Sequence, residues 1–115
     1  MKYGHEAIFC IVNAGFSETA MEAAREYGAT GGTVIRARGT ANPEAERLFN
    51  ITIQPEKEIV MIVCKSALKD GILHGLYRAV GSSTAGNGIV FSMPVDETVG
   101  ISDFAAAKPS DEQKK

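Results

Sequence analysis

Two glycine-rich segments carry the residue types best suited to binding an anion. In the first, Arg36 and Arg38 follow a glycine-rich turn and are separated by one residue. On a strand both side chains point to the same side, so two guanidinium groups can converge on one phosphate or carboxylate. The second is the turn of small residues 84–88, whose backbone N–H groups are expected to line an anion-binding nest. The candidate ligand-binding residues are Gly31, Thr33, Arg36, Arg38, Gly39, Thr40, Gly86, Asn87 and Gly88.

Both segments also have a purely structural interpretation. Glycine supplies tight connections between strands whether or not a ligand is present, and paired arginines on one strand face are often solvated. The residue types alone therefore leave open whether either segment binds a ligand.

The sequence carries no signature of catalysis or of metal binding. It contains neither a Gly-x-x-x-x-Gly-Lys-Ser/Thr phosphate loop nor a Gly-x-Gly-x-x-Gly segment after a strand. His5 and His74 lie far apart in the sequence, with no cysteine or carboxylate at ligand spacing. Cys10 and Cys64 lie in apolar runs, where burial raises the pKa of a thiol and lowers its reactivity. We therefore expect no enzymatic activity, no metal site and no required cofactor.

The composition is that of an ordinary soluble domain. With 115 residues, 44% of them apolar, the chain can form one domain whose core needs no disulfide. Twelve basic and fourteen acidic side chains give a net charge of −2, which disfavours nucleic-acid binding by phosphate neutralisation. No apolar run is long enough to span a bilayer, and the N-terminus does not resemble a secretory signal. Together with two cysteines in apolar runs, these features predict a cytoplasmic protein without membrane insertion.

Hydrophobic periodicity predicts four strands and two helices. Strands are expected over residues 6–13, 31–39, 59–64 and 89–93, and helices over 18–27 and 67–80, with Ser17 and Ser66 as their N-caps. The polar residues 40–54 are expected to form an exposed connection, and the charged residues 55–58 to interrupt the chain before the third strand. Short additional strand segments are expected at 49–54 and 95–101. The predicted domain covers residues 1–104, and residues 105–115 are expected to form a disordered tail.

This order of elements predicts an α+β, ferredoxin-like βαββαβ fold, with a four-stranded antiparallel sheet and two helices on one face. Two helices can cover only one face of such a sheet. The predicted strand segments 8–12 and 59–63 are nevertheless apolar at every position, so both of their faces should leave water. We therefore expect the uncovered sheet face to form contacts between copies of the chain.

Two segments of the chain resemble one known family. In the first, Gly28-x-x-Gly31-Gly32-Thr33-Val34 is followed by a basic residue, then Gly39, and then a polar excursion that ends at Pro55 before an apolar strand. The second, Gly86-Asn87-Gly88-Ile89-Val90-Phe91, is similar to a Gly-Asp-Gly-Lys-Ile-Phe stretch. These segments resemble the nitrogen regulatory P-II signalling proteins, and the resemblance covers about residues 6–101.

The resemblance implies a homotrimer assembled through its sheet faces, with ATP or ADP in clefts between subunits and 2-oxoglutarate and Mg²⁺ beside them. Gly31 and Thr33 would border the adenine and ribose. Arg38-Gly39-Thr40 would lie near the phosphates, and Gly86-Asn87-Gly88 would face them from the neighbouring subunit. The loop over residues 40–54 would contact a partner protein, such as an ammonium transporter or a biosynthetic enzyme.

Several positions depart from the family pattern. The family's lysine after the second glycine turn is Ile89 here, and two arginines of the last strand fall on Gly100 and Ser102. The loop is shorter and contains no tyrosine for modification, and Lys57 is offset by one position from the family's lysine. Each missing charge-assisted hydrogen bond removes roughly 1.5–3 kcal/mol of binding free energy. Because a site with fewer cations suits a ligand with fewer phosphates, AMP or ADP fits this sequence better than ATP.

The leading hypothesis is a non-enzymatic, P-II-like regulator. It would bind a small anionic effector, with an adenine nucleotide as the first candidate, and would regulate a partner protein through residues 40–54. The alternative is a CutA-like structural or metal-handling trimer of the same fold, which the few histidines and cysteines disfavour. A third hypothesis is an acylphosphatase-like hydrolase that uses Arg36 or Arg38 with Asn42 or Asn87.

Overall fold

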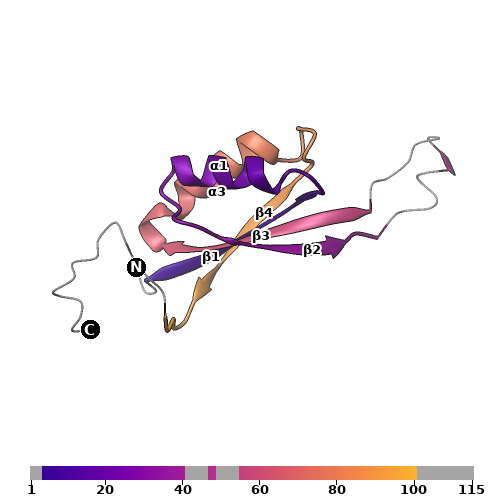
Figure 1. The fold of residues 1–115 in the computed structure, drawn as a ribbon. Coiled ribbons are helices and arrows are strands. Elements are labelled where there is room, and N and C mark those ends of the chain that lie inside the picture. The colour runs from indigo at the N-terminus through magenta and orange to yellow at the C-terminus, as the bar shows by residue number, and fades with distance from the viewer. Residues whose placement is uncertain (1–3, 41–46, 49–54, 101–115) are drawn as a thin grey trace.

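The computed structural model describes residues 4–40, 47–48 and 55–100, and its elements follow the predicted βαββαβ order (Figure 1). The strands are β1 (His5–Asn13), β2 (Thr33–Arg38), β3 (Glu56–Lys65) and β4 (Ile89–Val95). The helices are α1 (Ser17–Glu26) and α3 (Lys69–Val80), and the short 3₁₀ turn η1 (Ser66–Leu68) precedes α3.

The four strands form one sheet in the order β2-β3-β1-β4, and every neighbouring pair is antiparallel. Each helix connects two strands that have another strand between them, and both helices lie on the same face of the sheet (Figure 1). This arrangement confirms the predicted ferredoxin-like fold. The paired ends of β2 and β3 extend beyond the helices, so part of this hairpin is covered on neither face.

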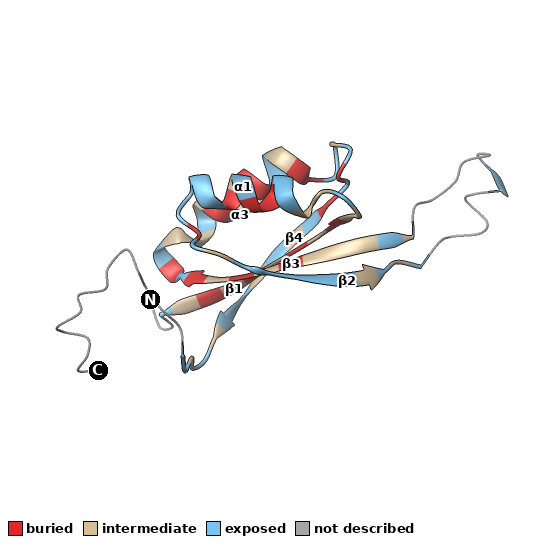
Figure 2. Cartoon of the chain, viewed as in Figure 1, coloured by how far each residue is buried: buried red, intermediate tan, exposed pale blue. Residues whose placement is uncertain are grey.

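The core lies between the helices and the sheet. Along β1 buried residues alternate with partly exposed ones, as expected for a strand with one covered face. Figure 2 shows the buried residues on the strands and on the helix sides turned toward the sheet. The largest fully buried side chains are those of Ile8, Ile62, Ile72, Leu76, Val12, Val60, Val80 and Cys10.

The opposite face of the sheet is apolar and uncovered in the single chain. Phe9 and Phe91 stack there with ring centroids 5.2 Å apart, and Phe91 is 42% exposed. Met93 and Ile89, on the same face of β4, are 48% and 62% exposed. On β2, Ile35 pairs with Ile59 and is also exposed. The strands are therefore apolar on both faces, and we call this uncovered surface the open face.

The structure corrects the predicted start of α1. Ser17 does not cap the helix through its side chain; instead, the backbone N–H groups of Gly15 and Ser17 both donate to Oε1 of Glu58 at 3.2 Å. A carboxylate at this position satisfies N–H groups that lack partners within the helix and interacts favourably with the helix dipole. The cap therefore comes from β3, more than forty residues away in the sequence.

Three other predictions about element boundaries need correction. β3 begins at Glu56 rather than Ile59, because the charged residues pair with β2 on one side and with the end of β1 on the other. Ser66 does not cap the second helix; it begins η1, and α3 starts at Lys69. No strand follows Val95 within residues 96–100. The predicted strand at 49–54, most of the 40–54 connection and the predicted tail at 105–115 lie outside the described residues.

Gly88 provides a test of how β4 is joined to the core. A Cβ atom there would lie 2.5 Å from the carbonyl oxygen of Val80 and 3.0 Å from Cγ1 of Val12, so neither the backbone nor the core leaves room for a methyl group. We expect Gly88→Ala to lower the free energy of unfolding by about 1–3 kcal/mol in urea denaturation. Gly31→Ala is the matched control, since nothing lies within 4 Å of its Cβ position. Equal stability of the two variants would contradict this packing.

Candidate functional site

Lys57 connects the two glycine-rich segments at one end of the sheet. Its Nζ donates to Oδ1 of Asn13 at 2.7 Å, and its Cε lies 3.0 Å from the position of a Cβ on Gly39. Asn13 in turn holds the second glycine turn: its backbone N–H donates to the carbonyl of Gly86 at 2.9 Å, and its Nδ2 donates to that of Ala85 at 3.1 Å. A lysine and an asparagine therefore lie between two parts of the candidate site that are nearly fifty residues apart in the sequence.

Arg36 and Arg38 lie on the other side of the sheet from Lys57. In the β2–β3 register, Arg36 pairs with Glu58 and Arg38 with Glu56, whereas Lys57 pairs with Ala37. Since side chains alternate along a strand, the two arginines share one face, as predicted. Neither guanidinium forms an ion pair or hydrogen bond with another described residue, and both are exposed. Two positive charges thus remain available on the uncovered part of the hairpin.

The other predicted residues of the first segment surround this hairpin. Gly31 is half-buried with open space around it, and Thr33 is the first residue of β2, where it pairs with Met61. The N–H of Gly39 donates to the carbonyl of Pro55 at 2.6 Å and closes the hairpin, and Thr40 follows it in an exposed position. Gly31 and Thr33 therefore lie at the opposite end of β2 from Gly39 and Thr40.

The second glycine turn does not present the free N–H groups that the sequence suggested. The N–H of Gly86 donates to Oγ1 of Thr84, that of Asn87 to the carbonyl of Thr84, and that of Gly88 to the carbonyl of Val80. Asn87 adopts a left-handed backbone conformation with φ of 49°. The turn therefore uses these donors to hold itself together. Gly86 and Gly88 are buried against Val80, so what the turn offers a ligand is the exposed side chain of Asn87.

The cysteines and histidines form no reactive centre in the described part of the chain. Cys10 and Cys64 are both buried and free of disulfides. Burial raises the pKa of the Cys10 thiol to about 11, and burial also raises that of Cys64, assisted by the charge of Glu6. Within residues 4–40, 47–48 and 55–100, no three His, Cys, Asp or Glu side chains gather as a metal site would require.

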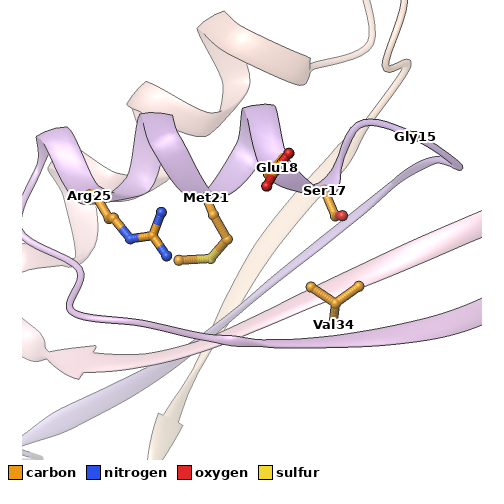
Figure 3. A pocket seen from close by; sticks show the side chains of 6 residues that line it. All are labelled: Gly15, Ser17, Glu18, Met21, Arg25 and Val34. Atoms are coloured by element: carbon orange, nitrogen blue, oxygen red, sulfur yellow. The ribbon is translucent and has the colours of Figure 1, made fainter.

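Two of the surface hollows in the described part of the chain flank the helices. One, of about 430 Å³, lies between α1 and β2 and is lined by Ser17, Met21, Arg25 and Val34, among others (Figure 3). The other, of about 390 Å³, lies between α3 and β4 and includes Gly88. Sequence reasoning identified Gly88 but none of the residues of the first hollow. It also missed Asn13, whose place opposite Lys57 follows only from the register of β1 with β3.

The fold and the polar end of its sheet define a ferredoxin-like domain with a candidate anion site. A family model described as nitrogen regulatory protein P-II matches residues 6–103, and the chain belongs to this family, whose members are signalling regulators. The crystal structure of Arabidopsis thaliana PII bound to citrate is similar, with a TM-score of 0.61 at 19% sequence identity. The similarity covers 81% of this chain and 76% of that one, and it shows a common fold. A search of curated proteins found no match.

Neither helix described here is long and apolar enough to cross a membrane.

The raised pKa of Cys10 predicts a loss of stability at high pH. Below pH 9 the thiol is protonated in both states, but between 9 and about 11 the unfolded chain releases a proton that the folded chain retains. The free energy of unfolding should therefore fall as the pH rises through this range. Urea denaturation below pH 9 and near pH 11 measures the fall, which should be smaller in Cys10→Ala. An equal fall in both proteins would show that the thiol does not contribute.

Proposed function

We propose that the protein is a non-enzymatic, P-II-like signal-transduction protein. It binds a small anionic effector, with an adenine nucleotide as the first candidate, and regulates a partner protein through the loop over residues 40–54. Family membership supports the general role, and the connection of Gly39 to the Gly86–Gly88 turn through Lys57 and Asn13 is the observation that carries the site. The partner would be a membrane transporter or an enzyme of nitrogen metabolism. The buried free thiols fit a reducing, cytoplasmic environment.

The charges available at the hairpin suit an anion. An ammonium group has three donors, and among the described residues Lys57 uses one of them for Asn13. Arg36 and Arg38 have no ionic partner among the described residues, and their long side chains lie on an edge strand. A phosphate or carboxylate bound at this edge would therefore meet Arg36 and Arg38 on one face of the hairpin, with Lys57 on the other face.

The limited number of cations favours a nucleotide with few phosphates. Ile89, which occupies the position of the family's lysine, is apolar and 62% exposed at the start of β4. Gly100 likewise supplies no charge. With these contacts absent, AMP or ADP has fewer unneutralised charges than ATP in the proposed site.

The proposed site is completed by a second copy of the chain. The open face exposes large apolar side chains from β4 and β2, which a homotrimer would bury. In such an assembly the edge of one sheet lies beside its neighbour, so a neighbouring subunit would add residues to the end of the sheet where Lys57 and Asn13 connect Gly39 to the Gly86–Gly88 turn. An effector in that cleft would contact the base of the loop at Gly39 and Thr40, and would thereby bias the loop toward one conformation.

Calorimetric titration with AMP, ADP, ATP and 2-oxoglutarate tests this proposal. We expect saturable binding of an adenine nucleotide and roughly 10- to 100-fold weaker binding by Arg38→Ala, because one charge-assisted contact is lost. Arg25→Ala removes another exposed arginine, on α1, and should bind the nucleotide like the unmodified protein. No heat with any of the four compounds would remove the nucleotide-sensing function, and equal losses in both variants would place the nucleotide elsewhere.

A further inference from the structure

The hollow between α1 and β2 has the chemistry of a second ligand site, on the opposite face of the sheet from Lys57. Residues 17, 21 and 25 of α1 are four apart and share one face of the helix, and Figure 3 shows their side chains directed toward β2. Val34 projects from β2 toward them on the face of the sheet opposite Lys57. The space between them, about 430 Å³, is large enough for a small metabolite.

The floor and wall of this hollow are apolar. Met21 is almost fully buried beneath it, while Val34 is 45% exposed although it lies on the helix-covered face of the sheet. Its neighbour in the sheet, Val60, is fully buried. The edge strand thus exposes a hydrophobic side chain that α1 does not reach, and a ligand with methylene groups would cover it.

The charges along the hollow are arranged as a dipole. At one end, Glu18 lines the hollow, and Glu58 approaches the same end through its bonds to Gly15 and Ser17. Glu58 accepts the N–H of Ser17, and the carboxylate of Glu18 forms no hydrogen bond or ion pair with a described residue. At the other end is Arg25, whose guanidinium forms no ion pair or hydrogen bond with any described residue. Arg36 lies opposite Glu58 in the β2–β3 register but does not line the hollow.

The spacing of these charges restricts the ligand. Glu18 and Arg25 are seven residues apart, which is about 10 Å along a helix axis. The arginine side chain leans toward the helix N-terminus and shortens the gap between the two charged groups. This separation exceeds that between the ammonium and carboxylate of an α-amino acid backbone. It suits a carboxylate and an ammonium group at opposite ends of a short methylene chain.

We propose that this hollow binds a linear zwitterion of the ω-amino acid type, a class that includes the side-chain ammonium and α-carboxylate of lysine and ornithine. The carboxylate pairs with Arg25, the ammonium with Glu18 and the hydroxyl of Ser17, and the methylenes lie against Met21 and Val34. This site does not depend on the nucleotide cleft.

The test uses the full chain and 6-aminohexanoate as probe, with hexanoate and hexylamine as single-charge controls. We expect saturable shifts of the backbone amide NMR signals of Ser17, Met21 and Val34 with 6-aminohexanoate, and at least 10-fold weaker effects with either control. Arg25→Gln and Glu18→Gln should each weaken binding about 10-fold or more, since each removes one charge-assisted pair. Glu22→Gln changes an exposed carboxylate of the same helix outside the hollow and should have no effect.

Each alternative outcome overturns the proposal. Three results would each show that the hollow is not a zwitterion site. They are the absence of saturable shifts, binding of hexanoate as tight as that of 6-aminohexanoate, and binding that neither Arg25→Gln nor Glu18→Gln weakens. The variants replace partly or fully exposed side chains, and an unchanged thermal unfolding midpoint confirms that they are folded. Nucleotide titration of the same variants separates this site from the proposed effector cleft, because neither substitution should alter nucleotide affinity.

Discussion

The sheet is apolar on both faces, but the chain has only two helices with which to cover it. The helices bury one face completely at Ile8, Val60 and Ile62, whereas Phe91 and Ile89 remain exposed on the other. A surface of this kind is costly in water, and we propose that other copies of the chain cover it. The proposed effector cleft depends on this packing, because its second wall would come from a neighbouring subunit.

The layout of the fold was predictable because it depends on local patterns. The order of elements and the ferredoxin-like class follow from three local patterns. These are the runs of β-branched residues, the apolar stripe at helical spacing after Ser66, and the glycines at the turns. The predicted element boundaries and caps were wrong where residues distant in the sequence determine the local structure. The charged residues that begin β3 form a strand only because β1 and β2 flank them, and α1 is capped by Glu58 rather than by the adjacent Ser17.

The candidate site was predictable only in part, for the same reason. Glycine spacing and alternating arginines identified Gly39, Arg36 and the second turn from their residue types. The sequence could not show that the N–H groups of the turn are used internally, since the acceptor of Gly88 is the carbonyl of Val80 at the end of a helix. Nor could it show that Lys57 and Asn13 meet, which requires the register of β1 with β3.

The central claim is that the open face is buried between copies and creates the cleft in which an effector binds. Light scattering of the purified full chain, coupled to size-exclusion chromatography, measures this directly and requires no knowledge of the effector. We predict a mass equal to three chains that persists on dilution, because large apolar areas give stable interfaces. A mass equal to one chain would mean that the open face stays in solvent, and it would contradict the account of the site.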